Sequence, residues 1–400
     1  MVTSHEAVIV STARTAIGTA RKGSLVDVDA FELGTRAVAE AVRRSGVAPE
    51  RFDDVVLGES LYGGGDIARY AALEAGLVGA AGIAHNRHCA SGLAAVQTAA
   101  ASIRSGMDKF VVAGGTNSAS TAPRSVRRRL GDDEEAWEDW FPPSHVETPD
   151  APVMDMSITV GWNAAVKAGL TREDLDAWAL RSHQRAVAGI DAGAFRDEIF
   201  PVEVTRRDGT SFTFEVDEHP RRSTTPEKLA ALRPLHPEIA GFSITAGNSS
   251  GVNDGAAALV LADGAEAERL GLEPLAVVRA WASSGVPPAD TGLAPIAAIP
   301  RALERAGLGI GDIALWEINE AFASVPLATC RKLGIDDAIV NVLGSGCSLG
   351  HPIAMTGARQ VISLVHELRR RGGGTAVSAM CAGGGMASAV VLEVPAPAGA

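Results

Sequence analysis

The sequence contains few cysteines and no excess of positive charge. Only four of its 400 residues are cysteine, and no two of them form a CxxC pair. This low count argues against a disulfide framework or a structural zinc site, and it favours reduced thiols in a reducing compartment. Lys and Arg total 36 against 48 for Asp and Glu, a net charge of −12, which argues against binding to nucleic acid or to an anionic membrane.

Long hydrophobic runs are also missing. No apolar run approaches the ~18 residues of a membrane span. The opening residues, MVTSHEAVIVSTART, lack the basic end and long apolar stretch of a signal peptide. We therefore expect a soluble, cytoplasmic protein. The length of 400 residues predicts two or three domains, and the 46% of hydrophobic residues suffices for large buried cores.

One order of elements occurs twice along the chain. An amphipathic helix predicted over 31–46 precedes an apolar strand in 53–60, and a similar helix over 295–307 precedes a strand in 312–320. Each copy is followed by a further helix and another apolar strand. This repetition predicts two similar α/β units packed face to face, although any α/β protein repeats strand–helix units to some extent.

The stretch between the two copies has a different composition. Residues 119–250 are rich in Pro, Arg and acidic residues, and one helix is predicted there over 171–190. Long irregular insertions are usually functional, so we expect a loop domain that covers a site. We assign 1–118 with about 251–273 to the first half, 119–250 to the loop domain and 274–400 to the second half.

Cys89 lies directly before a predicted helix, in the segment NRHCASGLAAV. A helix N-terminus favours negative charge, so we expect the thiol to have a lowered pKa and to act as a nucleophile. The alternative is a small buried cysteine among alanines. The polar residues that precede it, Asn86, Arg87 and His88, favour the nucleophile.

Two further candidates lie in the second half. His351, in GSGCSLGHPIAMTGAR, is suited to act as a base towards a thiol or as a donor to a thioester oxygen; the alternative is a role in capping or loop ordering. Cys381 ends an apolar strand in SAMCAGGGMAS, where backbone N–H groups that include Gly383 could form an oxyanion hole. Cys381 is then either a proton-transfer group or a packed strand-end cysteine.

Two more segments carry candidate ligand contacts. Asn319 ends a predicted strand in WEINEAFAS, where it either holds a water or a carbonyl oxygen or caps the next helix. The turn at 248–251, in SITAGNSSGVNDG, either contacts the pantetheine arm of a nucleotide cofactor or is only a turn.

Together these motifs resemble the thiolase family. NRHCASGL, ITAGNSSGVNDGAA, INEAFA, LGHPI with TGAR, and CAGGGM occur in that order and at family-like spacing, and the resemblance extends from about residue 6 to 395. It implies the thiolase fold, an α/β architecture with two βαβαβαββ halves in a five-layered αβαβα core and an inserted loop domain. It also implies coenzyme A and acetyl-CoA as substrates, no permanently bound cofactor or metal, and a homodimer or homotetramer.

The resemblance further implies roles for individual residues. Cys89 would be the nucleophile that becomes acylated, and His351 would activate it. His351 and Asn319, acting through a water, would form one oxyanion hole, and the backbone N–H groups of Cys89 and Gly383 would form the second. Cys381 would move the α-carbon proton of the second thioester. Candidate contacts to coenzyme A and the acyl group are Ser250, Arg221, Ala246, Met156, Phe322 and His236.

The implied activity is reversible cleavage or Claisen condensation of 3-ketoacyl-CoA through an acyl-cysteine, with acetyl-CoA C-acetyltransferase as the default form. One alternative is a degradative 3-ketoacyl-CoA thiolase for longer or branched chains, and another is a non-catalytic protein of this fold that binds acyl-CoA or lipid. The chain departs from the usual family pattern at several positions, none of them a catalytic side chain: Asn117, Ala119, Asp155, Ser157, Gly161, His236 and Ala354. We expect these departures to affect acyl-chain specificity rather than the chemistry.

Overall fold

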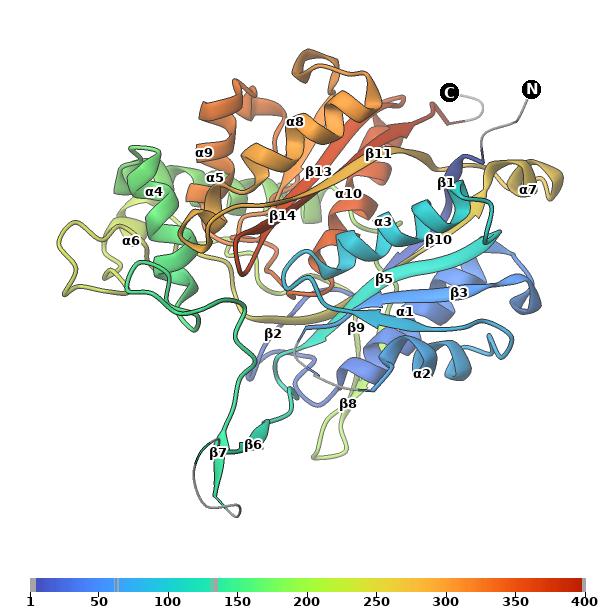
Figure 1. Cartoon of the computed structure of the whole chain (residues 1–400), viewed down its shortest axis with the longest axis horizontal. Coiled ribbons are helices and arrows are strands. Elements are labelled where there is room, and N and C mark those ends of the chain that lie inside the picture. Colours follow the sequence, from blue (N-terminus) through green and yellow to red (C-terminus); the bar gives the residue numbers. More distant parts are fainter. Residues whose placement is uncertain (1–4, 61, 63–64, 130, 132–135, 398–400) are drawn as a thin grey trace.

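A ten-stranded mixed β-sheet runs through the centre of the computed structural model, which describes residues 5–60, 62, 65–129, 131 and 136–397 (Figure 1). Its strand order is β12-β13-β14-β11-β1-β10-β5-β3-β4, with β2 paired to β10. The strands of the sheet are β1 (Ala7–Arg14), β2 (Gly18–Thr19), β3 (Asp54–Gly58), β4 (Ile83–His85), β5 (Phe110–Ser118), β10 (Asn253–Asp263), β11 (Ala276–Gly285), β12 (Leu315–Ile318), β13 (Gly374–Ala382) and β14 (Met386–Val394).

Helices cover both outer faces of the sheet and also fill the space between its two parts. Figure 1 shows α1 and α2, then β3, β5 and β10, then α3 and α10, then β11, β13 and β14, and finally α8 and α9. The predicted five-layered α/β architecture is therefore present. The helices are α1 (Ala30–Ser45), α2 (Ile67–Glu74), α3 (Ser91–Arg104), α4 (Asn163–Lys167), α5 (Arg172–Asp191), α6 (Pro226–Ala230), α7 (Gly264–Arg269), α8 (Pro295–Ala306), α9 (Ser324–Leu333) and α10 (Thr356–Arg370). None of the helices in the described residues is long and apolar enough to cross a membrane.

The repeated elements form where the sequence predicts them. Helix α1 ends at Gly46 with a φ of +67°, and α8 ends at Gly307 with a φ of +69°, a left-handed conformation that glycine adopts at no steric cost. Strands β3 and β12 follow these helices as expected. The two parts of the sheet are not separate, however, because β1 and β11 pair at Val8↔Val277 and Ile9↔Ala276.

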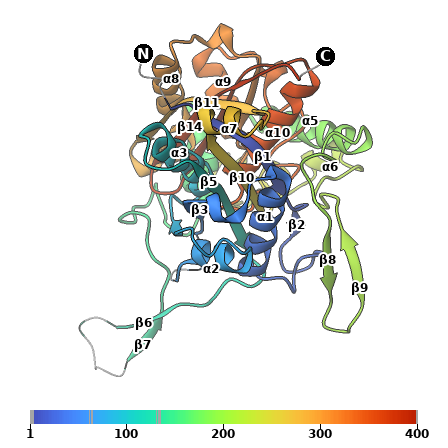
Figure 2. The ribbon, with the colours of Figure 1, turned by 90° about the vertical axis from the view of Figure 1, so that its right-hand side faces the viewer.

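Residues 119–250 carry α4, α5, α6 and two hairpins, β6 (Val126–Arg128) with β7 (Trp137–Asp139) and β8 (Val202–Thr205) with β9 (Ser211–Phe214). Figure 2 shows both hairpins extending away from the body of the molecule. Helix α5 matches the helix predicted over 171–190, and a reciprocal capping box between Thr171 and Asp174 fixes its start. The domain boundaries that the sequence suggests remain a prediction.

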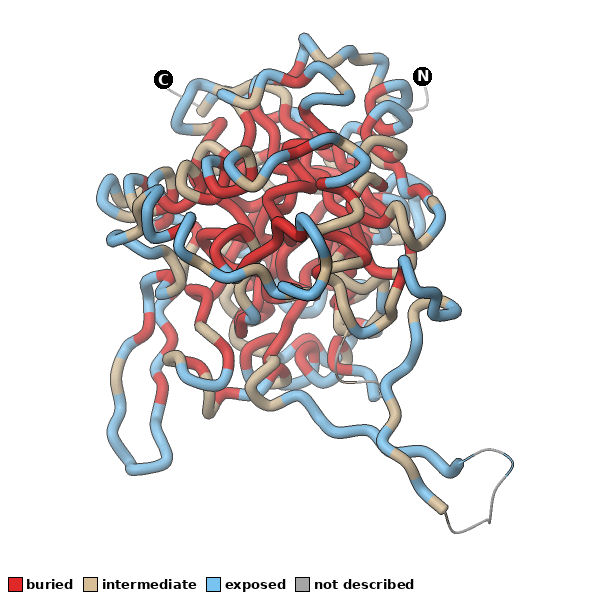
Figure 3. The backbone as a smooth tube through the Cα atoms, turned by 90° about the vertical axis from the view of Figure 1, so that its left-hand side faces the viewer, coloured by how far each residue is buried: buried red, intermediate tan, exposed pale blue. Residues whose placement is uncertain are grey.

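Buried residues concentrate in the middle of the molecule, whereas the hairpins and outer loops are exposed (Figure 3). The innermost apolar cluster draws on both halves of the chain, with Leu93 and Val96 of α3 packed in the same core as Val361 and Val365 of α10. This shared core surrounds the two helices whose N-terminal ends carry the candidate catalytic segments.

Glycines allow α3 and α10 to approach each other closely. A Cβ atom at Gly92 would lie 2.5 Å from the carbonyl oxygen of Ala354, and one at Gly357 would collide with the backbone of Leu93. Side chains at these two positions would push the helices apart. The close crossing sets the start of α3, just after Cys89, beside the start of α10.

We expect Gly92→Ala to separate the two helix starts. Overpacking at a close backbone contact typically costs about 1–3 kcal/mol, so the free energy of unfolding measured in urea should fall by that amount, and turnover should fall with it. Gly79→Ala is the matched control because a Cβ there meets no atom within 4 Å. Unchanged stability and turnover in Gly92→Ala would show that the crossing does not depend on this glycine.

Candidate active site

Cys89 lies on the turn between β4 and α3. Its neighbour His88 has a φ of +46°, which is uncommon for a residue with a side chain. Three hydrogen bonds hold this conformation. The His88 N–H donates to Asn86 Oδ1 (2.7 Å), Ser91 Oγ donates to the His88 carbonyl (2.6 Å), and the Arg87 N–H donates to Ser91 Oγ (2.8 Å). The turn that presents the thiol is therefore fixed by its own polar residues.

The thiols of Cys89 and Cys381 lie close enough to influence each other. Burial raises the pKa of Cys89 to about 11, even though the thiol accepts hydrogen bonds from the backbone N–H of Gly383 and from its own. Burial and the neighbouring Cys89 raise the pKa of Cys381 well above its usual range. The lowered pKa that the helix N-terminus predicts for Cys89 is thus wrong, because desolvation outweighs the two backbone donors.

Hydrogen bonds fix which nitrogen of His351 carries its proton. The Thr356 hydroxyl donates to the Pro352 carbonyl (2.8 Å), so towards His351 Nδ1 (2.7 Å) it can only accept. Nδ1 must then be protonated, which leaves Nε2 as the acceptor nitrogen of the ring. The His351 backbone N–H donates to Asn253 Oδ1 (3.0 Å), which fixes the residue from its other side. This tautomer is the one that can act as a base through Nε2.

Both groups of the candidate nucleophile and base pair are neutral at pH 7. Burial, together with the charge of Arg359, lowers the pKa of His351 to about 3, and the thiol of Cys89 stays protonated. Among the described residues, no hydrogen bond joins Cys89 to His351. A proton must therefore leave Cys89 as it attacks, because no thiolate–imidazolium pair exists beforehand.

Asn319 follows β12 and is fully buried. Its Nδ2 lies 3.4 Å from His351 Nε2, and its Oδ1 accepts no hydrogen bond from the described residues. Helix α9 begins only at Ser324, after Ala323 and without a side-chain cap. The alternative that Asn319 caps the next helix is therefore wrong, and its amide keeps an acceptor free beside His351.

Three of the predicted substrate contacts, Arg221, Ala246 and Ser250, line one cavity of about 410 Å³. Arg21 and Lys22 supply further positive charge at the same cavity. Guanidinium and ammonium groups gathered at a cavity suit the phosphates of a nucleotide. The remaining lining residues are Thr19, Ala20, His219, Leu235, Ser249, Gly251 and Val252.

The other three predicted contacts, Met156, Phe322 and His236, do not line this cavity. Phe322 is buried against Gly161, where a Cβ would lie 2.8 Å from its ring. Met156 is partly buried beside the apolar cluster that contains Phe322. These two residues contribute to a hydrophobic wall, whereas His236 lies in a polar cluster of its own.

Two of the sequence departures, Asp155 and His236, meet in space. His236 Nε2 lies 2.7 Å from Asp155, and its Nδ1 lies 2.7 Å from Glu238. The hydrogen bond to Glu238 and the charge of Asp155 raise the pKa of His236. His236 therefore bridges two carboxylates, which pattern matching at single positions does not reveal.

Several residues that the sequence analysis did not assign hold the site together. Thr356 and Asn253 fix His351, and both occur inside motifs that the sequence already singles out, TGAR and NDG. Arg21 and Lys22 occur in no motif, so only the cavity reveals them. The buried Glu320 and Asn341 beside Asn319 are the other unassigned members.

Comparison with known proteins gives full-length matches. The family model described as "Thiolase, N-terminal domain" matches residues 7–265, and the model described as "Thiolase, C-terminal domain" matches 272–394. The chain is 41% identical to an acetyl-CoA acetyltransferase of Pseudomonas aeruginosa over 97% of its own length and 99% of that protein. It is also 41% identical to a 3-ketoacyl-CoA thiolase of Bacillus subtilis, with the same coverage. The crystal structure of the Bacillus anthracis acetyl-CoA acetyltransferase matches with a TM-score of 0.90 at 39% identity, over 98% of this chain and 99% of that one.

The raised pKa of Cys89 predicts how the thiol reacts with iodoacetamide. Because only the thiolate reacts, its alkylation rate should rise about tenfold per pH unit from pH 7 to 9 without levelling off. The rate is measured by mass spectrometry of the modified protein, with Cys89→Ser as the control for the other three cysteines. A plateau below pH 8 would instead indicate the lowered pKa expected of a helix N-terminus.

Proposed function

This chain belongs to the thiolase family, and from that premise we propose that it is an acetyl-CoA C-acetyltransferase acting through an acyl-cysteine on Cys89. The observation that carries the proposal is the cluster of Cys89, Cys381 and the Gly383 N–H. Cleavage of the carbon–carbon bond of a 3-ketoacyl-CoA needs three groups close together: a nucleophilic thiol, a second thiol that supplies a proton, and a backbone N–H that stabilises the oxyanion. The matching length and names of the similar acetyltransferases support the same conclusion.

In the cleavage direction, Cys89 attacks the 3-keto carbon of the substrate. A carbon–sulfur bond forms, and the thiol proton passes to Nε2 of His351. The oxyanion accepts hydrogen bonds from the N–H groups of Cys89 and Gly383, which already point to the sulfur. These donors need no reorganisation, because α3 and the glycine turn hold them in place.

The bond between carbons 2 and 3 then breaks and releases the enolate of acetyl-CoA. The Cys381 thiol gives its proton to the enolate carbon, and its raised pKa ensures that it holds that proton at neutral pH. The enolate oxygen is stabilised by the protonated His351 and by Asn319, which acts through a water. The acyl group remains on Cys89, while Cys381 is left as a thiolate.

Coenzyme A completes the cycle by attacking the acyl-cysteine. Its thiol proton passes to the Cys381 thiolate, the new thioester bond forms, and the bond to Cys89 breaks. The departing Cys89 sulfur recovers the proton held by His351. All three groups return to their starting protonation states, and the same steps in reverse give the condensation. Coenzyme A is a substrate in this cycle, and no bound cofactor or metal enters it.

We assign the cationic cavity to the nucleotide end of coenzyme A, with Arg221 near a phosphate and Ser250 and Ala246 along the pantetheine arm. We also assign Met156 and Phe322 to the wall of the acyl pocket, because both belong to one apolar cluster. His236 and Asp155 pair with each other within the loop domain. A degradative thiolase for longer or branched chains is the alternative, favoured by the segment NRHCASGL around Cys89.

We further propose that the working form is a homodimer or homotetramer. Strand β4 forms an open edge of the sheet with Ile83 exposed, and Tyr70, Leu73 and Val78 are exposed large hydrophobics nearby in sequence. Hairpin β6–β7 carries the exposed Val126 and Trp137 away from the body. A reducing compartment such as the cytoplasm fits the four free cysteines.

The experiment that tests the function is the rate of coenzyme A-dependent cleavage across 3-ketoacyl-CoA substrates, from acetoacetyl-CoA to long chains. Cleavage confined to acetoacetyl-CoA supports the acetyltransferase. A rate that rises with chain length supports the degradative alternative. Cleavage of none of these substrates would overturn the catalytic proposal in favour of a protein that only binds acyl-CoA.

We expect Cys381→Ala to separate the two halves of the reaction. The variant should still acquire an acetyl group from acetyl-CoA, because Cys89, His351 and both donors remain and coenzyme A can depart as a thiolate without a proton from Cys381. It should lose about 10²–10⁴-fold in cleavage and condensation, the usual contribution of a general acid or base. Mass spectrometry of the acetyl-enzyme and a turnover assay measure the two effects, and Cys89→Ser is the control that should acquire no acetyl group. Failure of Cys381→Ala to acetylate would place Cys381 in the first step.

A further inference from the structure

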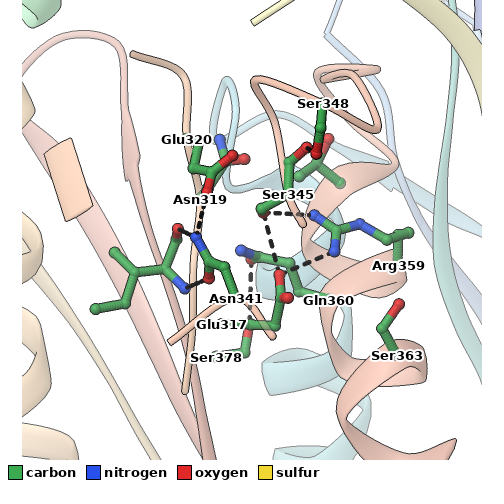
Figure 4. A network of polar contacts seen from close by, with 12 residues as sticks. Glu317, Asn319, Glu320, Asn341, Ser345, Ser348, Arg359, Gln360, Ser363 and Ser378 are labelled. Carbon is green, nitrogen blue, oxygen red and sulfur yellow. Dashed lines mark hydrogen bonds and ion pairs between the residues drawn. The ribbon is translucent and has the colours of Figure 1, made fainter. Parts of the chain in front are cut away.

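A buried carboxylate next to Asn319 takes no part in the steps above. Glu320 follows Asn319 directly after β12 and is completely buried. Figure 4 shows it beside Asn319, with Asn341 and Ser348 close by, while Glu317 of β12 pairs with Arg359. A carboxylate taken out of water is costly unless its oxygens are satisfied, so its retention needs an explanation.

Four hydrogen bonds satisfy the Glu320 carboxylate. Oε1 accepts from Trp178 Nε1 (2.8 Å) and from Asn341 Nδ2 (2.8 Å). Oε2 accepts from Ser182 Oγ (2.6 Å) and from the Cys347 N–H (3.1 Å). All four donors are neutral, and they come from α5 and from the connection that precedes α10. Glu320 therefore ties the end of β12 to α5 and to the connection that precedes α10.

Ile318, the residue on the other side of Asn319, is fixed as well. Asn341 has a φ of +52° and directs its side-chain amide at Ile318. Its Oδ1 accepts from the Ile318 N–H (2.8 Å), and its Nδ2 donates to the Ile318 carbonyl (2.8 Å). The Asn341 side chain thus pairs with Ile318 as a neighbouring strand would. Because the same Nδ2 also donates to Glu320, both flanks of Asn319 depend on one connected network.

Asn319 itself has few partners that could hold it. Its backbone N–H donates to the Ala379 carbonyl (3.0 Å), but among the described residues its side chain has only the long contacts to His351. His351, in contrast, has anchors of its own in Thr356 and Asn253. The position of the Asn319 side chain is therefore set by the adjacent residues Ile318 and Glu320, whereas His351 is held directly by its own hydrogen bonds.

On the basis of the proposed function, we propose that Glu320 is a positioning residue that aims the Asn319 amide at the water that contacts the enolate oxygen. It acts through the main chain and never touches substrate. Its role concerns the step in which the α-carbon proton moves, because Asn319 belongs to the enolate oxyanion hole. Acylation of Cys89 relies on the N–H groups of Cys89 and Gly383 and does not need it. A merely structural Glu320 would affect both steps alike.

The test is Glu320→Gln, which keeps the size of the side chain. Whichever way the new amide is turned, its NH2 group faces N–H donors, Trp178 and Asn341 on one side or Cys347 on the other, so part of the network must open. We expect exchange of the acetyl-CoA α-protons into D2O, followed by NMR, to slow about 10- to 100-fold, a part of what loss of an oxyanion donor costs. Acetylation of Cys89, followed by mass spectrometry, should change less than about threefold.

Two further variants keep the proposal falsifiable. Glu198→Gln is the matched control, since Glu198 is another fully buried carboxylate, paired with Arg14 and bonded to no residue of the Glu320 network. It should lower the melting temperature while leaving the ratio of exchange to acetylation unchanged. In the double variant Asn319→Ala with Glu320→Gln, the loss of exchange should equal that of Asn319→Ala alone, because Glu320 acts through Asn319.

Several results would contradict the positioning role of Glu320. Equal losses of exchange and acetylation in Glu320→Gln, or additive losses in the double variant, would overturn the positioning role while leaving the proposed function intact. Wild-type exchange in Glu320→Gln would do the same. An inactive wild-type protein would instead contradict the proposed function, which separates that failure from failure of this inference.

Discussion

The close crossing of α3 and α10 is the constraint on which the site depends. The two helices belong to different halves of the chain. Cys89 lies just before α3, and His351 lies just before α10. The crossing is possible only because Gly92 and Gly357 present no side chain to the neighbouring backbone. Without this crossing, the turn that carries Cys89 and the segment that carries His351 would not lie side by side. The apolar residues around the two helices then bury His351 and pack against the partly buried Cys89.

That burial determines the protonation of the site more than any nearby charge does. It raises the pKa of Cys89 and lowers that of His351, so both groups are neutral before substrate arrives. The same burial keeps the proton on Cys381. Cys89 and Cys381 therefore each hold a proton that cleavage moves, and Nε2 of His351 is ready to accept one. Desolvation, which is often regarded as an energetic penalty, here keeps the Cys89 and Cys381 thiols protonated until the reaction moves those protons.

Much of this organisation could be predicted from the sequence. The helix caps at Gly46 and Gly307 and the apolar strands between them are local features, so α1, β3, α8 and β12 form where expected. The order of the motifs indicates the thiolase fold in the same way, since each motif sits at the end of a strand or the start of a helix. Local patterns predict local structure well because the physics that produces them is itself local.

What could not be predicted depends on distant contacts. The pKa of Cys89 is governed by burial, which the helix N-terminus alone does not reveal. The pairing of Asp155 with His236 joins positions far apart in the chain, and each looks like an isolated departure when taken singly. Asn319 resembles a helix cap until the helix is found to begin only at Ser324.

The pairing of β1 with β11 has a consequence for how the molecule comes apart. Because Val8 and Ile9 pair with the strand that opens the second half, the backbone hydrogen bonds run without a break from one half to the other. The central apolar cluster likewise takes side chains from both halves. Neither half can open without exposing the core of its partner, so we expect the two repeats to unfold as one cooperative unit despite their separate layers.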